Sequence, residues 1–312
     1  SLEELYNAHC KTLEPIFPTK SVDIKEKIET INFISQGEAK KSSIAIAKPR
    51  VFIPTFPGTN CEYDLQRAFE KAGANTNIEV FKNLTYKDIE DSIETIVKQI
   101  RKSQIIMLPG GFSAGDEPDG SAKFMATVFR NPKVAETINE FLTKQDGLML
   151  GICNGFQALI KLGLVPYGEI RETSVDAPTL TYNNIGRHQS KIVRTRIASN
   201  KSPWLAATEV GDTHSIAISH GEGKFVANEE VMRQLIANGQ IATQYVDFND
   251  NATYDIDFNP NGSTYAVEGI TSADGRIFGK MGHSERIGEH VIKNIIGEED
   301  QKIFESGVNY FK

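Results

Sequence analysis

The residues best suited to chemistry lie in Gly151-Ile-Cys153-Asn-Gly155, where a cysteine stands between two glycines. The segment follows a run of apolar residues and precedes a helical pattern. In this context G-x-[Ser/Cys]-x-G is typical of a nucleophile elbow. The N–H groups at the start of the helix would favour the thiolate and hold an oxyanion. A buried cysteine with glycines for packing is the alternative, but the agreement of strand, turn and helix favours the nucleophile.

A thiolate nucleophile needs a base and a group that orients the base. Gly282-His283-Ser284-Glu285 follows a strand-like apolar run over residues 277–281. His283 and Glu285 are two residues apart, so both side chains point to one side if the segment is extended. An exposed turn with an ordinary histidine and glutamate would look the same. The position after a strand favours His283 as the base, oriented by Glu285.

A glycine pair, Gly110-Gly111, follows a buried strand expected over residues 104–109. Glycines at such a point let the backbone approach a ligand closely, and their N–H groups could provide an oxyanion donor beside that of Asn154. A phosphate-binding loop is the competing interpretation. The Lys and the Ser or Thr of the G-x-x-x-x-G-K-[ST] motif are missing, so the oxyanion loop is favoured.

These segments require a sheet that brings their strand ends together. Apolar strands are expected over residues 50–55, 77–81, 104–109 and 147–152, and they alternate with helical patterns over 61–72, 86–101, 121–130, 133–144 and 154–162. Continuously apolar strands separated by amphipathic helices indicate a parallel sheet buried on both faces. We therefore predict a doubly wound α/β fold, in which ligands bind at the carboxyl ends of the strands.

The sequence pattern changes after about residue 175. Short strands separated by turn residues are expected, and Asp274-Gly275 is a hairpin signal; the strands cover residues 191–197, 214–219, 241–248 and 264–271. We predict that these add antiparallel strands in the C-terminal half.

Residues 1–48 differ from the rest of the chain. Leu2, Leu5 and Leu13 could line a helix that ends at Pro15 and Pro18, and residues 21–33 have helical spacing. A polar, linker-like stretch follows over residues 35–43. We expect residues 1–48 to be an appendage and residues 49–312 to be the compact domain.

Composition narrows the functional classes. The 34 Lys and Arg against 41 Asp and Glu leave a net charge of −7 over 312 residues, which argues against a dedicated nucleic-acid-binding protein. The longest apolar runs have about six residues, a membrane span needs about 20, and no signal peptide is visible. We expect a cytoplasmic protein with neither a membrane nor a nucleic acid as partner.

Cysteine and histidine spacing gives no sign of a metal or a disulfide framework. Cys10, Cys61 and Cys153 are far apart, no C-x-x-C occurs, and the six histidines lack zinc-site spacing. We therefore expect no metal site in this chain.

Six motifs in chain order resemble those of class I, triad-type glutamine amidotransferases, and most closely the glutaminase domains of phosphoribosylformylglycinamidine synthases. The motifs are Phe56-Pro-Gly-Thr-Asn-Cys-Glu62, Pro109-Gly-Gly-Phe-Ser-Ala-Gly-Asp-Glu117, Gly151-Ile-Cys-Asn-Gly-Phe-Gln157, Ser219-His-Gly-Glu-Gly223, Asn259-Pro-Asn-Gly-Ser263 and His283-Ser-Glu-Arg286. The resemblance runs from about residue 49 to residue 286 or beyond. It implies a class I glutamine amidotransferase-like, flavodoxin-like sheet.

The resemblance implies roles for individual residues. Cys153 matches the nucleophile, His283 the base and Glu285 the residue that orients it. Gly111 and Asn154 match the oxyanion-hole amides. The residues that match glutamine or substrate binding are Gln157 and Arg187.

Two departures from the family pattern stand out. Arg187 is followed by His188 where the family usually has Phe, and Gly282 and Ser284 flank His283 where many members have proline. Losing those prolines should loosen the segment. No role follows for His220 and Glu222 of the fourth motif, because a site histidine and a structural one fit equally well.

The resemblance also implies the reaction and its partner. Cys153 would attack L-glutamine and form a glutamyl thioester, and the released ammonia would pass to an ATP-dependent synthetase that makes formylglycinamidine ribonucleotide in purine biosynthesis. No cofactor is expected in this chain, whereas ATP and Mg²⁺ are expected in the synthetase domain or subunit. Residues 1–48 would be the tail of a preceding synthetase domain or the connection to it.

Two alternatives stay open at the level of sequence. One is the glutaminase of another class I amidotransferase, serving GMP, CTP or anthranilate synthesis; the long second and fifth motifs count against it. The other is a non-enzymatic chaperone or stress protein of the related elbow-cysteine type, which would lack the Cys-His-Glu order.

Overall fold

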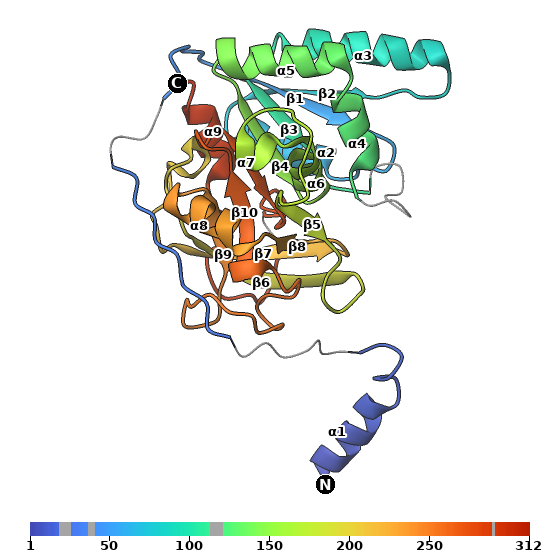
Figure 1. The fold of residues 1–312 in the computed structure, drawn as a ribbon, viewed down its shortest axis with the longest axis vertical. Coiled ribbons are helices and arrows are strands. Elements are labelled where there is room, and N and C mark those ends of the chain that lie inside the picture. The colour runs from blue at the N-terminus through green and yellow to red at the C-terminus, as the bar shows by residue number, and fades with distance from the viewer. Residues whose placement is uncertain (19–25, 37–40, 113–120, 289–290) are drawn as a thin grey trace.

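The computed structural model describes residues 1–18, 26–36, 41–112, 121–288 and 291–312. Within these residues the main sheet has nine strands in the order β2-β1-β3-β4-β11-β10-β9-β6-β7. The first five strands of this order run parallel and the remaining pairings are antiparallel. The sheet therefore has a parallel half and an antiparallel half (Figure 1).

The parallel half consists of short, almost wholly buried strands, apart from the half-exposed edge strand β2. They are β1 (Arg50–Thr55), β2 (Asn75–Val80), β3 (Ile105–Leu108), β4 (Leu148–Ile152) and β11 (Ile277–Lys280). Their order is that of flavodoxin-like sheets, in which ligands bind where the strand order reverses. The predicted fold class is confirmed in this half.

Helices cover both faces of the parallel half, as predicted. Right-handed crossovers place α2 (Glu62–Lys71) on one face and α3 (Tyr86–Ile100), α4 (Lys123–Phe129), α5 (Pro132–Lys144) and α6 (Asn154–Leu162) on the other. The contacts agree with this division, because α2 packs with α9 (Ile303–Asn309), whereas α3 packs with α5 and α4 with α6.

The antiparallel half continues the same sheet. Its strands are β6 (Gln189–Ile197), β7 (Thr213–His220), β9 (Ile241–Tyr245) and β10 (Val267–Thr271). A separate two-stranded sheet pairs β5 (Thr179–Thr181) with β8 (Lys224–Val226). The remaining short elements are α7 (Leu164–Tyr167), η2 (Pro203–Leu205), α8 (Glu229–Ala237) and η3 (Thr264–Ala266).

Two predicted strands extend three residues beyond the observed ones, and the predicted hairpin is right. The strand expected over residues 264–271 begins only at Val267, because Tyr265 and Ala266 have positive φ and form the 3₁₀ turn η3. The strand expected over residues 241–248 ends at Tyr245. The Asp274-Gly275 signal joins β10 to β11, with Gly275 at φ 82°.

The N-terminal 48 residues follow the sequence prediction only in part. α1 (Leu2–Lys11) forms as expected, and it lies apart from the rest of the molecule (Figure 1). The helix predicted over residues 21–33 is wrong for its described part, since residues 26–33 are extended and Phe33 pairs with Ser199. Residues 19–25 and 37–40, and with them part of the predicted helix and linker, lie outside the described residues.

The extended segment is anchored on the antiparallel half. Ile31 is 3% exposed; its N–H donates to Gln244 Oε1 at 2.8 Å, and its carbonyl accepts from Arg196. The boundary predicted between residues 48 and 49 stays a prediction. None of the helices in the described ranges has the length and apolar character that a membrane crossing would need.

Candidate active site

The predicted nucleophile lies in a strained turn between β4 and α6. Cys153 has φ 53° and ψ −107°, a backbone conformation that residues other than glycine rarely adopt. The flanking glycines are required by packing, because a Cβ on Gly155 would lie 2.0 Å from the Leu108 carbonyl oxygen. A Cβ on Gly151 would in turn lie 2.7 Å from the backbone of Gly155. The geometry is that of the predicted elbow.

The predicted base lies beyond the end of the neighbouring strand. β4 and β11 pair in parallel, with Ile152 opposite Lys280, and the Cys153 N–H donates to the Lys280 carbonyl at 2.9 Å. His283 therefore emerges beside Cys153. Its Nδ1 lies 2.6 Å from Glu285 Oε1, and both side chains are buried. The predicted third residue thus contacts the ring nitrogen that it would need to orient.

Electrostatics favour a charged imidazole at this position. Burial alone would lower the pKa of His283, but the Glu285 carboxylate and hydrogen bonds with Cys153 and Cys61 raise that pKa well above its usual value. Burial likewise opposes ionisation of Glu285, yet the charge and hydrogen bond of His283 hold the pKa of this carboxyl below its usual value. The pair is therefore arranged as imidazolium and carboxylate, facing a thiol that the imidazolium would stabilise as thiolate.

The glycine pair brings the loop after β3 into the same site. A Cβ on Gly110 would lie 2.9 Å from His283 Cε1, 3.2 Å from Cys61 Sγ and 3.5 Å from Cys153 Cβ. Gly111 has φ 140°, and a Cβ there would meet the backbone of residues 58–60 at 2.6–2.9 Å. Only glycines therefore fit between the loop after β1 and the thiol. Residues 113–117 of this motif lie outside the described residues.

A cavity of about 270 Å³ opens at the thiol. It is lined by the predicted nucleophile, oxyanion-loop and binding residues together with the fourth motif, namely Gly111, Phe112, Ser121, Cys153, Gln157, Tyr182, Gly186, Arg187, His188, His220, Gly221 and Glu222. Its volume is near the lower end of ligand pockets, about 300–1,000 Å³, and suits a ligand of the size of one amino acid.

The predicted glutamine-binding residues are held by their neighbours. The buried Asn154 side chain donates from Nδ2 to Gln157 Oε1 at 3.0 Å, and Gln157 Nε2 donates to the Glu222 carbonyl. Gln157 therefore ties the start of α6 to the fourth motif. Arg187, from the loop before β6, also lines this cavity, and its role in substrate binding stays a prediction.

The fourth motif forms the wall opposite the elbow. Cys153 Sγ donates to the Ser219 carbonyl at 3.7 Å, and Glu222 Oε2 accepts from the Ser121 N–H at 3.1 Å. His220 is fully buried, and burial together with the charges of His283 and His188 lowers its pKa to about 3. A neutral imidazole is thus part of the wall. Neither of its ring nitrogens has a hydrogen-bond partner among the described residues.

The fifth motif supports this wall from behind. Asn261 Nδ2 donates to the Gly223 carbonyl at 2.7 Å, and Ser263 Oγ accepts from the Phe225 N–H at 3.1 Å. Asn259, also fully buried, donates to the Ser263 carbonyl. The motif therefore acts on the site through residues 220–226, without lining the cavity itself.

Cys61 is a site neighbour that the sequence interpretation missed. It is fully buried, its Sγ lies 3.9 Å from His283 Nδ1, and Arg286 Nη2 donates to the same sulfur at 3.1 Å. The available signal was its place at the start of α2, after the loop that follows β1, because parallel strands end at one edge of the sheet and only β3 separates β1 from β4.

Metal-ligating side chains come together once in the described part of the chain. The ligand atoms of Cys61, His283 and Glu285 lie within 4.8 Å of one another. These atoms already contact each other or Arg286, so the group is better described as a hydrogen-bonded cluster. The expectation that the chain holds no metal stays a prediction.

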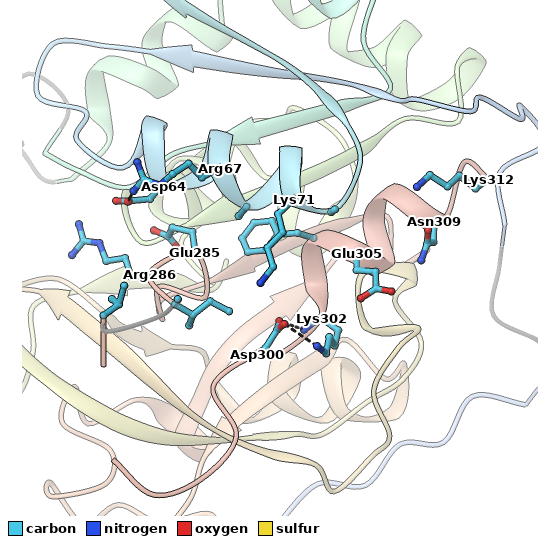
Figure 2. A pocket seen from close by; sticks show the side chains of 16 residues that line it. Asp64, Arg67, Lys71, Glu285, Arg286, Asp300, Lys302, Glu305, Asn309 and Lys312 are labelled. Carbon is cyan, nitrogen blue, oxygen red and sulfur yellow. Dashed lines mark hydrogen bonds and ion pairs between the residues drawn. The ribbon is translucent and has the colours of Figure 1, made fainter. Parts of the chain in front are cut away.

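A larger cavity, of about 850 Å³, includes Glu285 in its lining (Figure 2). Glu285 and Arg286 line it together with residues of α2 and α9. Figure 2 shows Lys71 pointing into the same space as the bonded pair Asp300 and Lys302. Its lining has mixed charge and does not include Cys153, so the smaller cavity is the one that fits the predicted chemistry.

Comparison with known proteins shows the family of this chain. The CobB/CobQ-like glutamine amidotransferase domain matches residues 48–311. Phosphoribosylformylglycinamidine synthase subunit PurQ of Dehalococcoides mccartyi is 34% identical over 241 residues, which are 77% of this chain and 86% of that protein. The same subunit of Thermotoga maritima is 30% identical over 267 residues, 85% of this chain and 99% of that protein.

A solved structure is also similar. The structure of PurLQS from Thermotoga maritima matches with a TM-score of 0.61 and 28% sequence identity, covering 85% of this chain and all of that one. Together with the domain match, these relatives show that the chain belongs to the CobB/CobQ-like glutamine amidotransferase family, among the PurQ subunits of phosphoribosylformylglycinamidine synthase.

Proposed function

We propose that this chain hydrolyses L-glutamine and supplies ammonia to the synthetase part of phosphoribosylformylglycinamidine synthase, in purine biosynthesis. Family membership supports the assignment of the activity. The single structural observation that carries it is the meeting of Cys153, His283 and Glu285 beside a cavity of amino-acid size.

The proposed reaction has two halves. The Cys153 thiolate attacks the side-chain amide carbon of glutamine, while the N–H groups of Gly111 and Asn154 hold the oxyanion. The His283 imidazolium gives its proton to the departing nitrogen, and a glutamyl thioester and ammonia result. Neutral His283 then takes a proton from water, the hydroxide attacks the thioester, and glutamate and the thiolate are released. Glu285 keeps the imidazole oriented throughout.

The second half of the enzyme lies outside this reaction. We propose that the synthetase partner binds ATP and Mg²⁺ and uses the ammonia to make formylglycinamidine ribonucleotide. The partner is a PurL-type domain or subunit, as in the PurLQS assembly of Thermotoga maritima. The cytoplasmic location expected from the sequence stays a prediction.

The domain division is part of the proposal. Residues 49–312 form the glutaminase domain and residues 1–48 an appendage or linker, which the family match over residues 48–311 supports. The contacts of residues 30–33 with the antiparallel half mean that part of the appendage packs on the domain.

Substituting Cys153→Ala in the complex with the synthetase tests the assignment. Glutamine-dependent turnover should fall to background while turnover with free ammonium persists, because only the ammonia source is lost. Equal loss with both nitrogen sources would overturn the nucleophile assignment.

Thiol labelling separates this proposal from a non-enzymatic elbow-cysteine protein. A glutamine-analogue affinity reagent should label Cys153 and leave Cys10 and Cys61 unmodified, since Cys153 is the one of the three that lines the cavity. Preferential labelling of Cys10 or Cys61, or no protection by glutamine, would count against a glutaminase.

A further inference from the structure

The segment that carries His283 has glycine and serine where proline could stiffen it. Gly282 and Ser284 flank the histidine, and the sequence alone predicts a loosened segment. The structure instead shows a buried ion pair beneath it. Lys280 Nζ lies 3.1 Å from Glu268 Oε1, and both side chains are completely buried. Burying two charges costs free energy unless further hydrogen bonds satisfy them. The groups that form these further hydrogen bonds therefore indicate the role of the pair.

Each charge of the pair holds the backbone beside the base. Glu268 Oε1 accepts from the Gly282 N–H at 2.6 Å, and Lys280 Nζ donates to the Gly282 carbonyl at 2.8 Å. Lys280 Nζ also donates to Ser284 Oγ at 3.0 Å. The ion pair therefore bonds the residue before His283 twice and the residue after it once.

The surrounding network fixes the pair from outside. Glu268 Oε2 accepts from Thr243 Oγ1, and Ser284 Oγ donates to Gln301 Oε1 at 2.6 Å. The His283 N–H itself donates to the Ala217 carbonyl at 2.8 Å. The His283 segment is thus held by β7, β9, β10 and the chain before α9, all of them outside the elbow.

We propose that Glu268 and Lys280 are positioning residues, which hold the His283 segment in the geometry that the proton transfers require. Neither side chain is among those that line the thiol cavity, and their contacts reach the base only through Gly282 and Ser284. The proposal rests on the proposed function, in which His283 is the base.

Gly282 is part of the same device. A proline there would remove the N–H that Glu268 accepts, and any Cβ would lie 2.7 Å from Ile216 Cγ2, 2.9 Å from Glu268 Oε1 and 3.1 Å from Lys280 Nζ. The N–H of Gly282 and its lack of a side chain therefore both suit the buried pair. Hydrogen bonds from side chains here restrict the backbone, as the fixed φ angle of a proline would restrict it in a segment that contains proline.

The test uses the full chain in complex with its synthetase partner. The double variant Glu268→Gln with Lys280→Met removes both charges, so neither is left buried without its counterpart, as it would be in a single variant. Glutamine-dependent kcat should fall roughly 10- to 10²-fold, as expected for a catalytic group misplaced by about an ångström. KM for glutamine and ammonium-dependent turnover should stay near the parent values.

The pH dependence of kcat/KM is a second measurement, and a loss of stability alone would not change it. If His283 shifts away from Glu285, the alkaline limb of kcat/KM moves to lower pH, because the charge that raises the pKa of His283 is then more distant. Ile270→Ala on β10 is the matched control: Ile270 is fully buried and makes no bond to residues 282–284. It should lower stability and leave kcat and the alkaline limb unchanged.

Unchanged kcat and pH profile in the double variant would overturn the proposal, and so would an equal fall of kcat in Ile270→Ala. Failure of the underlying function is recognised separately with His283→Ala. If that variant keeps glutamine-dependent turnover, His283 is not the base. If it loses turnover while the double variant does not, only the positioning role is wrong.

Discussion

The proposed nucleophile, Cys153, and the proposed base, His283, are placed by different physical means, although they emerge from neighbouring strands. Around Cys153 the constraint is steric: Gly155 packs its Cα against the Leu108 carbonyl and leaves no room for a side chain. Around His283 it is polar, because Glu268 and Lys280 hold Gly282 by hydrogen bonds. Close packing fixes a backbone with few alternatives, whereas a buried polar network fixes it only while every member is satisfied.

The difference also separates what sequence can show from what it cannot. A steric constraint forces particular residue types into a short local motif. A polar network draws on residues scattered over the chain, and each of them looks like an ordinary surface residue when read alone.

Gly155→Ala should have the largest effect. Its Cβ would lie 2.0 Å from a backbone oxygen that cannot move without shifting β3, so we expect the free energy of unfolding to fall by about 3 kcal/mol or more. Gly282→Ala should cost about 1 kcal/mol, because its nearest atoms are side-chain ends. Urea unfolding of both variants measures these free energies. Equal losses of stability would contradict the distinction between a steric constraint around Cys153 and a polar one around His283.

Substitutions of the base and its carboxylate should differ in severity. His283→Ala removes the group that moves the proton and should lower the rate of thioester formation about 10²- to 10⁴-fold. Glu285→Gln loses a charge-assisted hydrogen bond worth roughly 1.5–3 kcal/mol, or about 10- to 10²-fold in rate. Single-turnover thioester formation compares them. A larger fall of the rate in Glu285→Gln than in His283→Ala would assign the decisive role to the carboxylate.

The same carboxylate should set the alkaline limit of activity. Burial lowers the pKa of His283 and the Glu285 charge raises it, with a net increase above the usual value of about 6.5. Thioester formation needs the imidazolium, so activity is present below the raised pKa and lost as pH rises through it. Removing the charge in Glu285→Gln should move the alkaline limb of kcat/KM to lower pH. If the alkaline limb of kcat/KM is unchanged in Glu285→Gln, another group determines the pH at which activity is lost.

Ser284→Ala should have the smallest effect. It removes the Ser284 Oγ bonds to Lys280 and Gln301, while both bonds between the ion pair and Gly282 remain. We expect a loss of about 1 kcal/mol of stability and glutamine-dependent kcat close to that of the parent. A fall as large as that of the double variant of Glu268 and Lys280 would place the main constraint at Ser284 instead.

Much of the fold and the elbow could be predicted because their causes are local. The apolar strands and the glycines around Cys153 follow from residues within a few positions of one another. The prediction of a helix over residues 21–33 is wrong for its described part. Ile31 and Phe33 form hydrogen bonds with residues 244 and 198, and these long-range contacts outweigh the helical spacing of the local sequence. Cys61 and the Lys280–Glu268 pair were missed for the same reason, as their partners lie 12 to 225 positions away.

The hydrogen bond from the Cys153 N–H to the Lys280 carbonyl has a consequence for how the site can be observed. It is the last backbone hydrogen bond between β4, which leads to Cys153, and β11, which leads to His283. Its acceptor belongs to Lys280 of the buried ion pair. Any fluctuation that separates the two strands at this edge must break it first. Deuterium uptake at this one amide, followed in the complex by mass spectrometry, therefore reports how often the two halves of the catalytic centre come apart without a substrate being turned over.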